Sequence, residues 1–402
     1  MQKRVRATIA SLAGTGLILT GLVMSPAWAV PDYPTAAEVA KAKQNVEDKK
    51  KMITRIEGIL DELQTEADAL EKVALQKNEQ YNQAKEAVNE MAAKVEGLEA
   101  KVTQAGEEAE IAKEQLGQIV ARMYRQGTSG NTTLEIFFNP ESSDELLYQL
   151  GASDVIAQRT QVIYQQALQK QADAKALASE LATAQAELED RRSAAQKLYK
   201  EAKAAADAVI AKVAESESQR ASMMSQLATL KDTAADLERQ RREGLEAERR
   251  QALVKTAPTA PELYTVGDPN SALVEQAIAF ASEQLGERYV LGGAGPNVWD
   301  CSGITMKSYA AAGVYIGWHS ATAQFNLMAA EKKLVPFQQA KRGDLIWWTT
   351  SSNFSGDKYH TAIYLGDGMM LEAPNPARTV RIVPVRYGEL FPYAARPTAA
   401  SN

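Results

Sequence analysis

The chain has 402 residues, a formal net charge of −6, and hydrophobic residues at 45% of its positions. This length allows two or three domains. A net negative charge without a basic tract argues against a nucleic-acid partner. The chain holds one cysteine and two histidines, so it cannot form an internal disulfide, and thiol or imidazole chemistry has few side chains to draw on.

Residues 1–29 have the pattern of an export signal. Three basic residues near the start precede an apolar run from about residue 9 to 24, and Ala27 and Ala29 supply the small residues that signal peptidase recognises. An uncleaved N-terminal anchor is the alternative, although the run is short for a membrane span. We therefore expect a secreted protein of the periplasmic or cell-wall space, which reaches a membrane only through a protein partner.

Residues 30–255 are predicted to form a coiled-coil regulatory or docking domain. A heptad seam runs from Ile53 to Met123, with Lys77 as its polar interruption, and predicts a helix about 100 Å long. Glycine and small polar residues break this register at 126–131. A second, Ala-rich helical stretch runs from about residue 155 to 250. Two long helices around a breaker predict an antiparallel hairpin.

A small apolar lobe is expected near residues 126–151, where the two helices join. The sequence Ser142–Glu145 is typical of a helix start. Such a cluster can belong to a local core, but a thin hairpin offers little core, so a partner-docking patch is the competing interpretation. The candidate docking residues are Leu134, Ile136, Phe137, Phe138, Leu146 and Leu147.

The C-terminal third differs in composition from the coil. Residues 256–268 mix proline with small residues and predict a semi-rigid linker. Residues 269–402 suffice for one compact domain. A helical pattern at 271–286 comes first, and strand patterns follow at 344–350, 360–368, 369–374 and 378–386. This order predicts an α+β domain.

Cys301 lies where a glycine-rich loop gives way to a helical pattern that ends at Gly313. A lone cysteine is commonly a buried bystander. A cysteine at a helix N-terminus is different, because the helix dipole favours the nucleophilic thiolate. We therefore interpret Cys301 as a candidate nucleophile.

A cysteine nucleophile needs a base and a group that orients the base. His360 opens a predicted strand, and Glu372 lies on the next strand after one hairpin turn, so antiparallel pairing would bring the two together. Each could instead be an ordinary solvated strand residue. His319 follows on a loop, with Ser320 and Gln324 nearby, and is either a substrate-cleft contact or a structural histidine.

These motifs resemble a known family. DCSG at 300–303, GDLIWW at 343–348 and HTAIYLGDG at 360–368 are similar to the NlpC-type, papain-like cysteine peptidases of bacterial cell walls. The resemblance covers about a third of the chain. It implies that Cys301 is the nucleophile and His360 the base. Many members carry His, Asn or Gln at the third position, whereas Glu372 here resembles the actinobacterial Rip-type branch.

The resemblance also implies a substrate site and a reaction. Tyr289 corresponds to the family's tyrosine that points toward the cysteine, and Asp300 and Ser302 match positions that contact the peptide stem. The implied reaction is hydrolysis of a peptidoglycan stem amide, between D-γ-glutamate and meso-diaminopimelate, through a thioester. It needs no metal or cofactor.

An exported coiled coil joined to a wall hydrolase resembles division hydrolases that the FtsEX membrane complex recruits. The resemblance implies a role in cell division and daughter-cell separation. From the break in register and the aromatic residues after it, we further expect the hairpin to dock on the extracellular region of FtsX, and the coil or linker to occlude the Cys301 cleft before docking. Two alternatives remain: a non-hydrolytic coiled-coil wall-binding adaptor, and an acyltransferase on the same scaffold.

Overall fold

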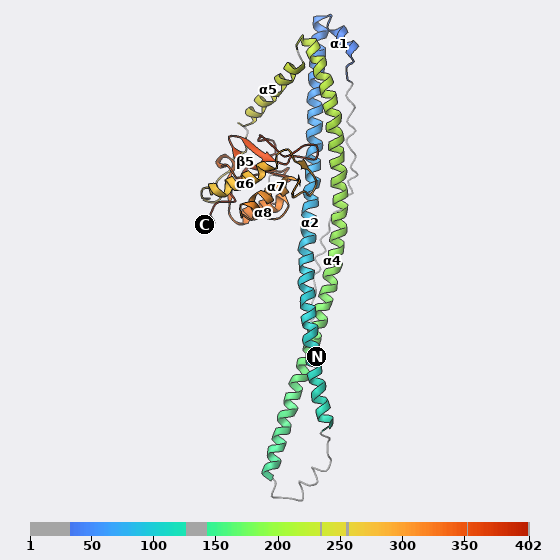
Figure 1. Ribbon diagram of the computed structural model, residues 1–402, viewed down its shortest axis with the longest axis vertical. Coiled ribbons are helices and arrows are strands. Elements are labelled where there is room, and N and C mark those ends of the chain that lie inside the picture. Colours follow the sequence, from blue (N-terminus) through green and yellow to red (C-terminus); the bar gives the residue numbers. More distant parts are fainter. Residues whose placement is uncertain (1–32, 126–142, 234, 255–256, 352, 401–402) are drawn as a thin grey trace, which may run out of the picture.

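The computed structural model describes residues 33–125, 143–233, 235–254, 257–351 and 353–400, and Figure 1 shows their arrangement. The expected export signal and the apolar segment 134–138 lie outside these residues. Helix α4 begins at Ser143, within the predicted start, but the side chains of Leu146 and Leu147 are outside the described set.

Two long helices form the predicted antiparallel hairpin, which confirms this part of the fold class. Helix α2 (Val46–Arg125) packs along α4 (Ser143–Lys231), and the short α1 (Ala36–Ala42) closes one end. Ile56 and Leu60 of the heptad seam pack with Met223 and Leu227 of α4. Burial of such facing apolar side chains is the main stabilising term of a two-helix hairpin.

The composition predicted one helical stretch continuing to about residue 250, but the structure breaks it into two helices. Helix α4 ends at Lys231, and α5 (Ala235–Val254) leaves in a new direction toward the C-terminal domain. Asp232 has a φ of 56°, and its carboxylate pairs with Lys43 and Lys49. A left-handed residue held by two lysines ends the helix locally, which helical periodicity cannot reveal.

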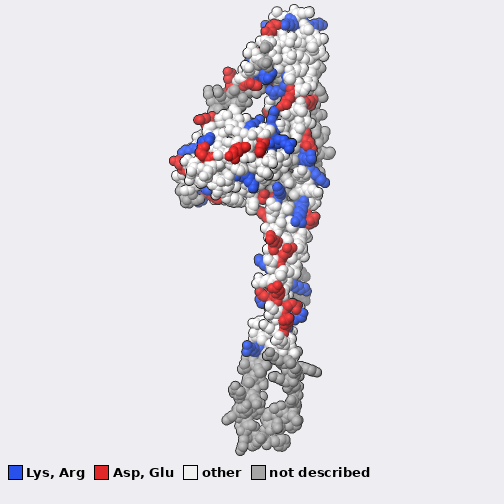
Figure 2. Space-filling model, in the orientation of Figure 1, with Lys and Arg blue, Asp and Glu red and all other residues white. Residues whose placement is uncertain are grey.

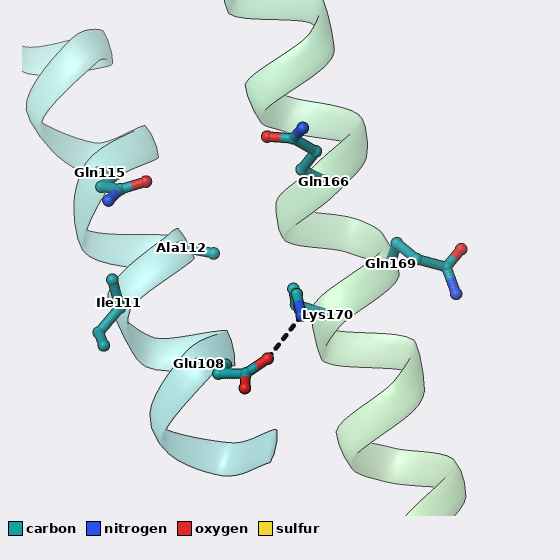
Figure 3. A pocket seen from close by; sticks show the side chains of 7 residues that line it. All are labelled: Glu108, Ile111, Ala112, Gln115, Gln166, Gln169 and Lys170. Carbon is teal, nitrogen blue, oxygen red and sulfur yellow. Dashed lines mark hydrogen bonds and ion pairs between the residues drawn. The ribbon is translucent and has the colours of Figure 1, made fainter. Parts of the chain in front are cut away.

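Toward the far end of the hairpin, α2 and α4 diverge around a cavity of about 430 Å³. Figure 3 shows Lys170 of α4 reaching across to Glu108 of α2 at its margin. The cavity is lined by Glu108, Ile111, Ala112, Gln115, Gln166, Gln169 and Lys170. Apart from Ile111, these side chains are polar or small, whereas apolar side chains pack together at the other end of the hairpin.

The C-terminal region is an α+β domain, as predicted. Its helices are α6 (Ser271–Glu283), α7 (Cys301–Ala311) and α8 (Ala321–Ala330), and a short parallel pair joins β1 (Arg288–Tyr289) to β2 (Val298–Trp299). The main sheet has the order β3-β8-β4-β5-β6-β7 and is antiparallel throughout. Its strands are β3 (Leu334–Pro336), β4 (Leu345–Trp348), β5 (His360–Gly366), β6 (Met369–Glu372), β7 (Arg381–Pro384) and β8 (Tyr393–Ala395).

The domain packs on the side of α2, as Figure 1 shows. Trp347 and Phe325 lie in its core, with ring centroids 5.4 Å apart. Leu75 of α2 belongs to the same hydrophobic cluster and is 3% exposed. The hairpin therefore contributes a side chain to the core of the domain.

The linker is not a free spacer in this structure. Tyr264 and Val266 pack against the domain core, the Tyr393 hydroxyl donates to the Pro261 carbonyl, and Arg396 donates to the Gly267 carbonyl. Acidic and basic side chains are interspersed over the face of the molecule drawn in Figure 2. Ion pairs such as Lys72–Glu389 and Arg378–Glu217 connect hairpin and domain.

Candidate active site

The local sequence places Cys301 at the first position of α7. Asp300 is the N-cap, with extended backbone, and its Oδ1 accepts from the Gly303 backbone N–H at 2.7 Å. A Cβ on Gly303 would lie 2.0 Å from the Gly293 carbonyl oxygen, so only glycine lets the helix approach the glycine-rich loop this closely. These requirements explain the residues on either side of Cys301.

The Cys301 thiol is buried and protonated in this structure. Burial, and then the nearby carboxylates of Asp300 and Glu79, raise the pKa of Cys301 well above its ordinary value. The backbone N–H groups of Thr361 and Ser302 act in the opposite direction. Contact with Thr361 places the thiol next to His360, at the start of β5.

His360 and Glu372 form a buried pair on adjacent strands. The β5–β6 register pairs Ile363 with Leu371, which puts His360 and Glu372 on the same face of the sheet. The distance from His360 Nε2 to Glu372 Oε2 is 2.7 Å, and both side chains are almost completely buried. Burial lowers the pKa of His360, so the ring is neutral and able to accept a proton.

Two arginines hold Glu372 as a carboxylate. Burial acts to raise the pKa of Glu372, but Arg386, and with it His360, keeps that pKa well below its usual range. Arg386 donates to both carboxylate oxygens, each at 2.7 Å, and Arg381 donates to Oε1 at 2.9 Å. Neither arginine was singled out from the sequence.

Tyr289 is buried close to Cys301. Its hydroxyl is buried and has no hydrogen-bond partner within the described residues. Burial, the largest cause, raises the pKa of Tyr289 well above 10, so the phenol stays protonated. A free buried donor near the thiol is what stabilisation of an oxyanion requires.

The remaining predicted residues form a second cluster beside the first turn of α7. His319 Nε2 lies 2.8 Å from Asp300 Oδ1, and Ser302 Oγ donates to the same oxygen at 3.2 Å. Gln324 has both ends of its amide engaged by α7, with the Ser302 carbonyl and the Thr305 hydroxyl. His319 and Gln324 therefore brace the helix that carries Cys301.

Helix α2 enters this site, which the sequence did not predict by residue. The amides of Asn78 and Asn82 donate to Asp300 Oδ2 at 3.2 and 2.9 Å. The Glu79 carboxylate accepts from the Ser320 hydroxyl at 2.6 Å. It also accepts from the backbone N–H groups of Ala321 and Thr322, at 2.9 and 3.0 Å. A buried carboxylate of the hairpin thus sits at the N-terminus of α8.

Within the described part of the chain, no group of three or more His, Cys, Asp or Glu side chains is arranged to hold a metal ion. Of the helices that the structure describes, none has an apolar stretch long enough to cross a membrane.

Comparison with known proteins agrees with the motif assignment. Residues 286–391 match the model of the NlpC/P60 family. Over 104 residues the chain is 38% identical to the peptidoglycan endopeptidase RipA of Mycobacterium tuberculosis. This match covers 26% of this chain and 20% of RipA. It is 33% identical over 159 residues to RipB of the same species, covering 35% and 62%.

Among solved structures, the peptidoglycan hydrolase RipB of Mycobacterium tuberculosis is 29% identical to this chain. The match covers 37% of this chain and 78% of that chain, with a TM-score of 0.28. The chain spans 20% of the length of RipA and 62% of that of RipB. The C-terminal region of this chain is therefore similar to the NlpC/P60 family and to Rip-type peptidoglycan endopeptidases.

Proposed function

We propose that this chain is a cysteine endopeptidase that hydrolyses peptidoglycan stem peptides. The observation that carries the proposal is the buried His360–Glu372 pair, at 2.7 Å, beside the chain's single cysteine at a helix N-terminus. The match of residues 286–391 to the NlpC/P60 family supports the substrate class. Export to the periplasmic or cell-wall space, suggested by residues 1–29, would place the enzyme with that substrate.

The proposed reaction proceeds by two acyl transfers. The Cys301 thiol gives its proton to His360 Nδ1 as sulfur attacks the amide carbonyl, and the carbonyl electron pair moves to oxygen. The Cys301 backbone N–H and the Tyr289 hydroxyl donate to that oxyanion. His360 then protonates the leaving amine, the C–N bond breaks, and a thioester remains. Water adds to the thioester with His360 as base, which releases a carboxylic acid and restores the thiol.

The proposed bond joins D-γ-glutamate to meso-diaminopimelate, and the N-terminus of α8 supports this choice. A γ-linked glutamate keeps a free α-carboxylate close to its reacting carbonyl. The donors that now hold Glu79, namely Ser320 and the backbone N–H groups of Ala321 and Thr322, suit such a carboxylate. On this proposal Glu79 occupies the place of a substrate group.

Mass spectrometry of fragments released from purified peptidoglycan tests the reaction and the bond together. In the Glu79→Ala chain, in which the contact of α2 with the site is weakened, we expect new termini at D-γ-glutamate and diaminopimelate, and loss of release when Cys301→Ala is added. Products in which an added amine replaces water would indicate an acyltransferase. Cleavage that persists in Cys301→Ala would remove the mechanism.

We further propose that α2 keeps the enzyme inactive until the hairpin moves. The amides of Asn78 and Asn82 donate hydrogen bonds to Asp300, and Glu79 accepts hydrogen bonds at the N-terminus of α8, so these polar groups are not available to a substrate. Glu79 is also among the charges that raise the Cys301 pKa. Docked α2 therefore excludes substrate and disfavours the thiolate, two effects that act together.

The substitution Glu79→Ala in the full chain tests occlusion. Removing the carboxylate leaves the α8 donors free and lowers the Cys301 pKa, so we expect at least about tenfold faster alkylation of Cys301 at neutral pH, together with higher hydrolysis. Glu90→Ala, an exposed glutamate on the same helix, is the matched control and should leave both rates unchanged. Equal rates for Glu79→Ala and the original chain would refute occlusion.

We propose that the extracellular region of FtsX is the partner that moves the hairpin during cell division and daughter-cell separation. Exposed apolar side chains at the far end of the hairpin, Ile111, Val162 and Leu168, support a docking role there. Replacing Phe137 and Phe138 with Ser should abolish pull-down of this FtsX region. Ile210→Ser, an exposed apolar residue elsewhere on α4, should preserve it. Binding that survives the double substitution would contradict docking through the lobe.

A further inference from the structure

Arg386 makes more hydrogen bonds to the residues around His360 than is usual for an arginine near the surface. Its two terminal nitrogens each donate to one oxygen of Glu372, at 2.7 Å, in the parallel arrangement that guanidinium and carboxylate groups favour. Its own carbonyl accepts from the Trp348 indole N–H at 2.8 Å. Both the backbone and the side chain of Arg386 are therefore fixed.

Trp348 lies between Arg386 and the catalytic histidine. The β4–β5 register pairs Trp348 directly with His360, and their ring centroids are 5.1 Å apart. The guanidinium carbon of Arg386 lies 5.1 Å from the Trp348 ring centroid, within the range of a cation–π contact. Arg386, Glu372, His360 and Trp348 thus form a closed ring of contacts.

We propose that Arg386 is a positioning residue of this site, which keeps Glu372 ionised and oriented so that His360 presents Nδ1 as the base. The proposal rests on the proposed function, because it assigns His360 the role of base. It adds a residue that acts only through Glu372 and His360.

The tautomer of His360 explains why the orientation of Glu372 matters. An ionised carboxylate can only accept, so Oε2 requires the hydrogen of a neutral His360 to be on Nε2. Nδ1 is buried and has no hydrogen-bond partner within the described residues, so it remains free to take the thiol proton. A protonated Glu372 would instead donate to Nε2 and move the imidazole hydrogen to Nδ1. Arg386 prevents this because both Glu372 oxygens already accept from it.

Three charged side chains and one thiol face His360, from four segments of the chain. Glu372 on β6 and Glu71 on α2 favour its protonated form, whereas Arg386, after β7, disfavours it. Cys301 on α7 is protonated in this structure and adds no charge. Removing the Arg386 cation should therefore raise the His360 pKa, since the negative charge of Glu372 would act on the ring with less opposition.

The chain has only two histidines, so NMR can follow His360 directly in the full protein, whether or not it is hydrolysing substrate. His319→Asn identifies the His360 ring signals. We expect Arg386→Met to move the His360 titration to higher pH, and Arg386→Lys, which keeps the charge, to leave it near its original position. Arg381→Met is the matched control: Arg381 contacts only Oε1, the oxygen that His360 does not use, so its shift should be smaller.

Hydrolysis provides the second measurement, made in the Glu79→Ala chain. Arg386→Met should lower kcat by about 100-fold, the cost of a displaced catalytic group, and move both limbs of the pH–rate profile to higher pH. Arg386→Lys should lower kcat without moving the profile, because lysine keeps the positive charge but cannot bond both Glu372 oxygens in the paired arrangement of a guanidinium group. Arg386→Gln serves if the methionine variant does not fold, as judged by its melting temperature.

The proposal is overturned if a folded Arg386→Met or Arg386→Gln chain keeps both the His360 titration and the pH–rate profile of the original. A uniform loss of activity with an unmoved profile would also overturn it, since it would show a merely structural role. If the titration moves but no chain cleaves peptidoglycan, the positioning of His360 stands and the proposed function fails.

Discussion

The domain contains two buried histidine–carboxylate pairs that look alike in distance and differ in charge balance. His360 and Glu372 are 2.7 Å apart, and His319 and Asp300 are 2.8 Å apart. Burial dominates at His360 and lowers its pKa, whereas at His319 the charge of Asp300 overcomes burial and raises the pKa. A histidine beside a buried carboxylate is therefore neutral in one pair and favours the cation in the other.

The difference lies in what else neutralises the carboxylate. Glu372 has Arg386 and Arg381, so its charge is balanced without its histidine. The other hydrogen-bond donors to Asp300 are uncharged amides, a hydroxyl and a backbone N–H, so His319 supplies the positive charge. The first arrangement suits the base of the proposed reaction, and the second suits a side chain that braces α7.

Substituting each histidine in turn should give the largest difference in hydrolysis between the two pairs. In the Glu79→Ala chain, His360→Ala should lower hydrolysis by at least about 1,000-fold, because no other group takes the thiol proton. His319→Ala should lower it by about tenfold, through a loosened α7. Release of stem-peptide fragments measures both, and comparable losses would show that the two pairs share one role.

Changing the carboxylates should give the next largest difference. Glu372→Gln removes the charge that orients His360 and leaves Arg386 unpaired, so we expect a loss of about 100- to 1,000-fold in kcat. Asp300→Asn keeps an oxygen for the α7 cap and should cost about tenfold in kcat. Initial rates and melting temperatures of both variants give the measurement; a larger loss for Asp300→Asn would reverse the assignment.

The smallest expected effect is on the pH dependence of stability, where the two pairs have opposite signs. The raised His319 pKa contributes stability that is fully present below the unfolded value of about 6.5 and is lost as pH rises through the folded pKa. The lowered His360 pKa favours the fold above about 6.5 and costs stability as pH falls below it.

Urea unfolding at several pH values checks this prediction. The stability difference between the original chain and His319→Asn should be largest at low pH and shrink as pH rises. For His360→Gln, the free energy of unfolding of the original chain should instead increase relative to that of the variant as pH rises. Parallel curves for the two variants would contradict the assigned charge states.

Local patterns predicted much of this molecule. The heptad seam predicted α2, and the strand patterns located β4, β5, β6 and β7. The pairing of His360 with Glu372 followed from a hairpin turn and the period of two. These features depend on neighbours within about a dozen residues, which periodicity and turn chemistry describe well.

The features that the sequence did not reveal depend on distant partners. Asn78, Glu79 and Asn82 lie off the heptad seam and look like an ordinary wet helix face, yet they bind residues more than 200 positions away. One signal was available: Leu75 is apolar outside the seam, at helical spacing from Asn78 and Asn82. Such a stripe indicates a second contact face but not its partner.

The path from α4 to the domain has a consequence for how α2 contacts the active site. Helix α5 and the packed segment 257–268 hold the domain to the same chain that supplies Asn78 and Glu79. The contact is therefore unimolecular, with a high effective concentration that dilution does not change. A modest interface is enough under this tether, and a free peptide copying α2 should inhibit poorly in trans. If α2 occludes the site as proposed, release requires a rearrangement of the hairpin, because no lowering of protein concentration can separate the two.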